Sequence, residues 1–330
     1  MTFRAIPPKK PARRRLTKAI IAHLPDYKDI HAIADKLAPG LSDDFIAAVK
    51  SARTRIGADV WERMLLDGKP NQDKLDDLVS VLADTLRPSL ERDYRTTLRS
   101  AGQTCLDAIT AAPRQAAEVA DDAAGAGAGG IATTTLLDDK VIPGVFDLND
   151  ANAIAFVSQH AGDLIVEVSD DVRQAVRAIV TASFEGEYDV RTTAKLLPSI
   201  VGLTERQAQA VTSFYAGMLK SEDHTTETAG QLADDYATRL LKQRAMTIAR
   251  TETIRGANAG VDMGFRQAQS SGLLDEGAMK TWITTPDDAL CDECADLDGE
   301  EVDLEDVFSS GDDAPPLHPN CRCAVGISRA

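Results

Sequence analysis

Aromatic residues are scarce in this sequence, and long apolar runs are missing. Phe, Trp and Tyr make up only 5% of the 330 residues, although hydrophobic residues reach 43%. Such a composition is typical of helices packed through Leu, Ile, Val and Ala, and less typical of a β-sandwich. No stretch approaches the roughly 20 apolar residues that a membrane-spanning helix needs. We therefore expect a mainly helical protein that does not enter a membrane.

Signatures of catalysis are also missing. The glycine cluster at 125–130 is not followed by the Lys and the Ser or Thr of a phosphate-binding loop. Ser158 and His160 are close in sequence, but on a helix their side chains would point to different faces, which does not suit a nucleophile and its base. We therefore predict that the protein is not an enzyme.

Charge is divided unevenly along the chain. Residues 1–20 carry seven Lys or Arg and no Asp or Glu, whereas the whole chain has a net charge of −16, so the remainder carries −23. A body this acidic repels phosphates, which argues against a general nucleic-acid-binding surface. The basic N-terminus is the exception: it could contact DNA, an anionic membrane or an acidic partner, or it could simply be a solvated terminus.

Changes in composition predict the domain organisation. Residues 1–15, basic and rich in proline, form an arm, and residues 16–122 follow a helical pattern. Residues 123–134 contain mostly Gly and Ala, which cannot build a core and so predict a linker. Residues 135–330 then form a second helical domain, which ends in a cysteine-containing module at 279–330.

The expected fold class is mainly α, with a helical N-terminal region, a helical middle domain and a small C-terminal α+β module that contains the cysteines. Pro88 should end or kink a helix, and Ser169 or Asp170 can cap the start of another. Thr204 begins a capping box, in which its side chain and that of the glutamine three residues later satisfy each other's backbone amides. A long helix is expected over 226–269, and strands are expected near 280–285 and 324–328.

Four of the five cysteines gather in the last 40 residues, in a pattern that predicts a metal site. Cys291-x-x-Cys294 is followed by His318-x-x-Cys321-x-Cys323. A CxxC turn sets two sulfurs at the separation that a tetrahedral ion needs, and thiolates with imidazole suit one structural zinc ion. Cys291, Cys294 and Cys321 with either His318 or Cys323 form the preferred set, while reduced thiols or a late disulfide are the alternatives.

A second group of polar residues lies upstream of the cysteines. Arg250, Ile254, Asn258, Val261 and Phe265 share one helix face, which places an arginine and an amide on an apolar stripe. Buried polar groups need partners. We expect Arg250 to bind a carboxylate or the carbonyls of the C-terminal loop, and Asn258 to bind the backbone of that loop. A pocket for an anion or another ligand is the alternative.

Taken together, these motifs resemble the C-terminal domain of phage Mu F-like head-morphogenesis proteins. The resemblance rests on the order of Ala249-Arg250-Thr251-Glu252, Asn258, Trp282-Ile283-Thr284, Asp288, Cys291-x-x-Cys294, Leu297-Asp298-Gly299 and Pro316-Leu317-His318-Pro319-Asn320-Cys321-Arg322-Cys323. The helical part from Phe146 through 202–206 is also similar, so the resemblance covers about 145–330. One departure is Ala289, where the family often has an arginine.

The resemblance implies a minor head protein of a tailed bacteriophage, present in few copies in the virion and assembled in the host cytoplasm. Its partners would be the portal and other capsid proteins. Packaged DNA is a further possible partner, which the basic arm would contact. Arg250, Glu252, Asn258 and Trp282 would be structural motif residues rather than a reactive set. The alternative function is a zinc-binding, nucleic-acid-interacting module, which the acidic residues around the cysteines do not favour.

Overall fold

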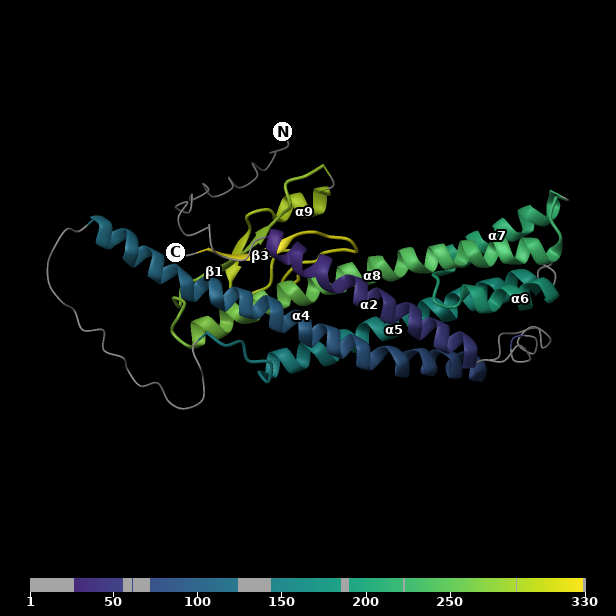
Figure 1. Cartoon of the computed structure of the whole chain (residues 1–330), viewed down its shortest axis with the longest axis horizontal. Coiled ribbons are helices and arrows are strands. Elements are labelled where there is room, and N and C mark those ends of the chain that lie inside the picture. Colours follow the sequence, from purple (N-terminus) through teal and green to yellow (C-terminus); the bar gives the residue numbers. More distant parts are fainter. Residues whose placement is uncertain are drawn as a thin grey trace, which may run out of the picture.

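The computed structural model describes residues 27–55, 61, 72–123, 144–184, 190–221, 223–288 and 290–328 (Figure 1). The predicted basic arm at 1–15 and nearly all of the predicted linker at 123–134 lie outside these residues. None of the described helices combines the length and the apolar character needed to cross a membrane.

The described part of the chain is mainly helical, as the sequence predicts. Three antiparallel strands form a small sheet in the order β2-β1-β3, with β1 in the middle. The helices are α2 (Tyr27–Arg55), α4 (Gln72–Ala123), α5 (Ala151–Phe184), α6 (Val190–Ile200), α7 (Glu205–Lys220), α8 (Thr226–Ser270) and the short α9 (Asp292–Leu297). The strands are β1 (Met279–Ile283), β2 (Glu301–Asp303) and β3 (Ala324–Ser328).

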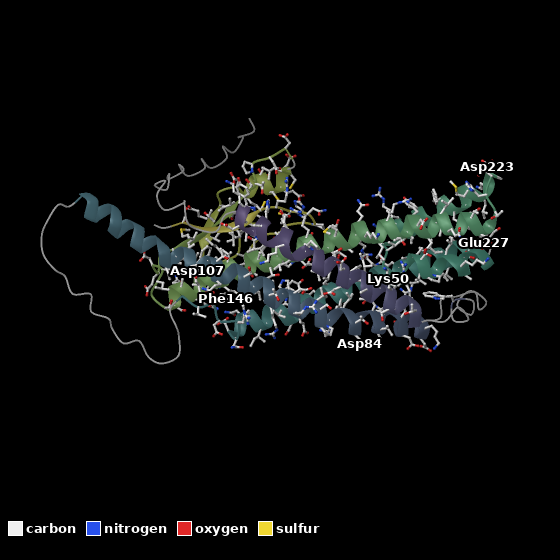
Figure 2. The ribbon with its side chains drawn as sticks, viewed as in Figure 1. Lys50, Asp84, Asp107, Phe146, Asp223 and Glu227 are labelled. Carbon is white, nitrogen blue, oxygen red and sulfur yellow. The ribbon has the colours of Figure 1, made fainter. Side chains whose placement is uncertain are left out.

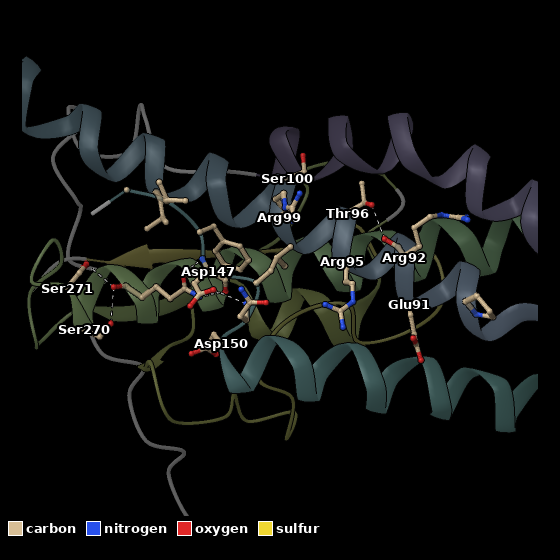
Figure 3. Close-up of a pocket in the computed structure, with 18 residues that line it drawn as sticks. Glu91, Arg92, Arg95, Thr96, Arg99, Ser100, Asp147, Asp150, Ser270 and Ser271 are labelled. Atoms are coloured by element: carbon tan, nitrogen blue, oxygen red, sulfur yellow. Dashed lines mark hydrogen bonds between the residues drawn. The ribbon is translucent and has the colours of Figure 1, made fainter. Parts of the chain in front are cut away.

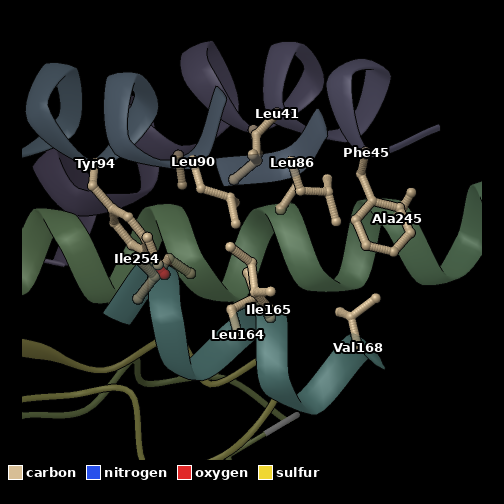
Figure 4. Close-up of a cluster of buried hydrophobic side chains, with 14 of the residues drawn as sticks. Leu41, Phe45, Leu86, Leu90, Tyr94, Leu164, Ile165, Val168, Ala245 and Ile254 are labelled. Atoms are coloured by element: carbon tan, nitrogen blue, oxygen red, sulfur yellow. The ribbon is translucent and has the colours of Figure 1, made fainter. Parts of the chain in front are cut away.

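Helix α8 is the element around which the others pack. It runs along most of the body, with α2, α4 and α5 beside it and the sheet near its C-terminal end (Figure 1). One continuous apolar core includes residues from α2 through β3. Figure 4 shows a part of it where four helices meet, formed by Leu41, Phe45, Leu86, Leu90, Tyr94, Leu164, Ile165, Val168, Ala245 and Ile254.

Glycines on α8 let α4 approach it closely. Gly256, Gly260 and Gly264 follow one another at intervals of four residues, so they lie on one face of the helix. A Cβ on Gly260 would lie 2.7 Å from the carbonyl oxygen of Leu98 on α4, and one on Gly264 would lie 3.0 Å from Cys105 Sγ. The missing side chains therefore allow the two helices to meet backbone to backbone.

Two helices are longer than the sequence predicts. α4 continues through Pro88, which was expected to end or kink a helix, and α5 continues through Ser169 and Asp170, which were expected to begin one. In α4 an unbroken leucine stripe is buried on both sides of the proline, from Leu75 to Leu90. Its packing offsets the roughly 3 kcal/mol that an interior proline costs. The capping box at Thr204 and the long helix α8 are as predicted.

Residues 144–150 dock onto both α4 and α8. The Gln103 side chain on α4 donates from Nε2 to the Gly144 carbonyl at 2.7 Å, and its Oε1 accepts from the Phe146 amide at 3.1 Å. The Phe146 ring lies over Gly102, where a Cβ would come within 2.2 Å of the ring. Figure 2 shows Phe146 in the same part of the view as Asp107. Gln267 on α8 exchanges two hydrogen bonds with the Asp147 backbone. This segment therefore ties α4, α8 and the start of α5 together.

Gly260→Ala should destabilise the protein, because its new methyl group meets the Leu98 backbone, which cannot move aside as a flexible side chain can. We expect a loss of about 1–3 kcal/mol, typical of overpacking, in urea unfolding followed by circular dichroism. Gly162→Ala on α5 is the matched control, since nothing lies within 4 Å of its added Cβ. That variant should gain about 0.5–1 kcal/mol from helix propensity. Equal effects of the two substitutions would contradict the close α4–α8 contact.

Candidate metal centre

The five predicted ligands come together in the C-terminal module. Cys291 and Cys294 lie at the N-terminus of α9, while His318 and Cys321 lie in the loop that leads from β2 to β3. His318 Nε2 lies 3.1 Å from Cys291 Sγ and 3.3 Å from Cys294 Sγ. Cys294 Sγ lies 3.7 Å from Cys321 Sγ. Two groups of three donors, one with Cys291 and His318 and one with Cys321 and Cys323, therefore share Cys294.

These separations fit a tetrahedral metal ion. Zinc–sulfur bonds of about 2.3 Å and zinc–nitrogen bonds of about 2.0 Å place two sulfurs about 3.8 Å apart and a sulfur and a nitrogen about 3.5 Å apart. The observed sulfur–sulfur distance of 3.7 Å agrees, and the sulfur–nitrogen distances of 3.1 and 3.3 Å are slightly shorter. The donor set, four thiols and one imidazole, is also of the type that binds such ions. The cluster can therefore hold a metal ion.

The backbone around the cluster orients its donors. Cys291 caps α9, because its Sγ accepts a hydrogen bond from the Cys294 amide at 3.4 Å. His318 Nδ1 lies 2.9 Å from the Pro319 carbonyl oxygen. A carbonyl can only accept, so Nδ1 carries the proton and the lone pair of Nε2 faces the sulfurs. This arrangement, in which one ring nitrogen is held by a carbonyl, is common for histidines that bind metals.

Crowding of the sulfurs shifts their pKa values in opposite directions. Hydrogen bonds from the Cys323 side chain and backbone lower the pKa of Cys321 to about 5. Burial and the neighbouring thiols raise the pKa of Cys294 to about 12, and the hydrogen bond with Cys321, together with burial, also raises the pKa of Cys323. A second or third thiolate is therefore unfavourable without a compensating charge. A divalent cation would supply that charge and favour ionisation of its ligands.

Asn258 connects α8 to the strand that follows the cluster. Its side chain is fully buried; Nδ2 donates to the Cys323 carbonyl at 3.1 Å, and Oδ1 accepts from the Val325 amide at 2.8 Å. The amide thus replaces the missing strand partner at the start of β3. The sequence prediction that Asn258 binds the backbone of the C-terminal loop is confirmed.

Two further side chains, one from α8 and one from α2, hold the same loop. Thr251 Oγ1 accepts a hydrogen bond from the Asn320 amide at 3.0 Å, at the residue where the loop has a positive φ of 60°. His31 Nε2 donates to the Arg322 carbonyl at 3.0 Å, and Thr285 Oγ1 donates to that carbonyl at 2.6 Å. The ligand loop is therefore fixed from both helices as well as from its own module.

The other residues singled out in the sequence have structural contacts. Arg250 binds the carboxylate of Asp35 on α2 at 3.1 Å, so the first of its two predicted partners is the one observed. Glu252 is buried and accepts from the Tyr94 hydroxyl at 2.6 Å. Trp282 on β1 is fully buried and meets the Phe308 ring edge to face at a centroid distance of 5.1 Å. None of these three residues belongs to the donor set of the cluster.

His31 and Tyr94 are the contributors that sequence reasoning missed. Each lies more than 150 residues away in sequence from the group it binds, Arg322 and Glu252 respectively. His31 stands outside every motif found in the sequence. Its role depends on where α2 crosses the module, and no local pattern records that crossing.

A larger concave feature lies elsewhere, between α4, the 144–150 segment and the end of α8. This groove has a volume of about 1280 Å³ (Figure 3). Its charged side chains are three arginines and three acids: Arg92, Arg95, Arg99, Glu91, Asp147 and Asp150. Asp150 accepts a hydrogen bond from the Asn152 amide and so caps the start of α5, while Asp147 accepts one from the Asn149 amide in the turn before the helix. Its lining therefore has balanced charge and does not assemble a nucleophile with a base.

Comparison with known proteins gives one family match, over part of the chain. Residues 219–326 match the family described as Phage Mu protein F like protein. The matched segment holds all of α8 and nearly all of the sheet, together with all five candidate ligands. No curated protein and no solved structure matches the chain. The resemblance drawn from the sequence is thus confirmed over residues 219–326, about a third of the chain.

Asn258→Ala should destabilise the module, because it leaves the Val325 amide and the Cys323 carbonyl buried without partners. Each such group costs about 1–3 kcal/mol, so we expect a loss of about 2–6 kcal/mol in thermal or urea unfolding. Gln269→Ala is the matched control: Gln269 is an amide on the same helix whose two bonds to backbone carbonyls are exposed. The control should lose less than about 1 kcal/mol. Similar losses in both variants would show that Asn258 is not an anchor of β3.

Proposed function

We propose that this chain, which is Mu F-like over residues 219–326, is a minor head protein of a tailed bacteriophage. It would enter the head at low copy number, associate with the portal and other capsid proteins during assembly in the host cytoplasm, and remain in the virion. The observation that carries the proposal is that the family-matched segment is also the segment in which α8, the sheet and the cysteine cluster are bonded into one unit.

The chemistry of the cluster supports a structural rather than a catalytic role. Four thiolate or imidazole donors complete the shell of a tetrahedral ion, whereas catalytic sites of this kind leave one position to water or substrate. Cys294 and Cys321 are buried, which limits the access of a substrate to these two sulfurs. We therefore propose that the protein is not an enzyme and that its cluster stabilises the C-terminal module.

We further propose that the cluster binds one structural zinc ion through Cys291, Cys294, His318 and Cys321. The three distances of 3.7 Å or less that link these four donors favour them as the set. Cys323 then accompanies the site as a neighbouring thiol. When bound, the ion would supply the positive charge that lets the crowded sulfurs ionise together and would join α9 to the loop before β3.

Purified full-length protein should contain about one zinc per chain, measured by elemental mass spectrometry, and chelation should lower its Tm. Cys294→Ser should remove nearly all of the metal, because Cys294 belongs to both groups of donors. Cys105→Ala is the control: this cysteine is buried on α4 against Gly264, away from the cluster, so its loss should leave the zinc content unchanged. A zinc-free native chain with free thiols would contradict the zinc proposal and leave the head-protein proposal standing.

The nucleic-acid-binding alternative finds little support near the cluster. The described residues beside Cys291 and Cys294 include five acids, Asp287, Asp288, Asp292, Glu293 and Asp296. Arg322 is a basic residue that lies in sequence between Cys321 and Cys323, and its guanidinium is already paired with Asp287. Phosphates would be repelled from this face. Contact with packaged DNA is therefore proposed only for the basic arm at 1–15.

Virion incorporation is tested on nuclease-treated, gradient-purified particles and proheads from the source phage. Quantitative mass spectrometry should find this chain in both, at a copy number far below that of the major capsid protein and comparable to that of the portal. Chemical cross-linking should then join it to portal or capsid subunits. Its absence from both particles, despite abundance in the infected cell, would overturn the proposed function.

A further inference from the structure

Lys280, the second residue of β1, is buried in an unusual way. Its side chain is fully buried, and Nζ has no hydrogen-bond partner among the described residues. The nearest carboxylate oxygen is Oδ1 of Asp262 on α8, at 3.6 Å, which likewise has no hydrogen bond. Water does not reach either atom, so two strongly polar groups face each other without the hydrogen bonds that buried polar groups normally make.

The surroundings of this pair are arranged around the two oxygens of Asp262. Arg266 Nε donates to Oδ2 at 2.9 Å, so one oxygen is held by a cation and the other faces the amine. The Phe308 ring lies 5.6 Å from Lys280 Nζ and covers that side of the pair. Asp313, which is largely exposed, places Oδ1 3.9 Å from Nζ, and it connects the buried pair with solvent.

From this geometry we propose that Lys280 and Asp262 condense to an intramolecular isopeptide bond, which links β1 covalently to α8. The amine and the carboxyl group are reactants that need no further co-reactant. Because they are held next to each other away from water, the carboxyl group does not need prior chemical activation. Intramolecular reactions of well-placed groups can reach effective concentrations of about 10⁵–10⁸ M. Amide formation, which is unfavourable between dilute reactants in water, becomes favourable in such a pair.

The condensation balances without an oxidant or a leaving group from outside. Transfer of one proton from the Lys280 ammonium to Oδ1 of Asp262 leaves a neutral amine and a neutral acid, which suit a site without water. The Nζ lone pair attacks Cγ, and Arg266 stabilises the negative charge that develops on Oδ2. Asp313 takes a proton from Nζ and returns it to the departing Oδ1 hydroxyl. The Cγ–Oδ1 bond breaks, the Nζ–Cγ amide remains, and one water leaves past Asp313.

Burial of Asp262 is consistent with this reaction. Desolvation raises the pKa of its carboxyl group, although Lys280 and Arg266 act in the opposite direction. The competing state is a plain buried ion pair with the same neighbours. The two states differ in covalent mass, so a mass measurement on the denatured chain separates them without reference to stability.

The test is intact mass spectrometry of the purified full-length chain after reduction and denaturation. We expect a mass lower than that of the sequence by one water. Trypsin should fail to cleave after Lys280 and should yield one branched peptide that joins residues 256–266 to residues 267–322. A chain of full mass that trypsin cleaves after Lys280 would overturn the proposal and establish an ion pair instead.

Substitutions at the pair give a second readout. Lys280→Arg keeps the positive charge but has no nucleophilic amine, so it should show the full mass of its sequence. Asp262→Asn should still react, but by loss of ammonia in place of water, which gives a different mass deficit. Asp313→Asn should slow the reaction, so that freshly purified protein contains both masses. A mass deficit that persists in Lys280→Arg would place the modification elsewhere and contradict the assignment.

Discussion

The close contact of α4 with α8 is the constraint on which the rest of the structure depends. Three glycines on α8 allow the two backbones to come close together. The other faces of α8 are packed against the remaining elements of the core. As a result the helix can carry buried polar residues, such as Glu252, Asn258 and Asp262, each with a defined neighbour. Buried polar groups of this kind are tolerated only when their partners are fixed. The position of the C-terminal module therefore depends on the fixed arrangement of α4 and α8.

The module itself is too small to stand on its own packing. Its sheet has three short strands, and its apolar centre rests chiefly on Trp282 and Phe308. Segments of this size are commonly held by metal ions, covalent links or contacts with a larger body. Here the cysteine cluster, the Asn258 bonds and the His31 and Thr251 contacts all act on the same loop. The stability of the module thus depends both on its own cysteine cluster and on the contacts that α2 and α8 make with it.

Local chemistry made part of this structure predictable. Some features depend on short spacings or on one helix face, so they can be recognised in the sequence. They are the Cys291 and His318 motifs, the capping box at Thr204 and the role of Asn258. The continuation of α4 through Pro88 could not be foreseen, because buried leucines on other helices outweigh the local penalty. His31 was missed for a related reason. Its partner is set by the crossing of α2 over the module, which arises only when distant segments pack together.

The family match and the folded unit have different boundaries. The match begins at residue 219, yet the face of α8 inside it is covered by α2 and α4, which lie before it in the chain. A fragment cut at that boundary would expose the α8 glycine face and lose His31 from the ligand loop. A fragment that keeps the ligand loop supported must therefore include α2, which begins at Tyr27, even though α2 lies outside the matched segment.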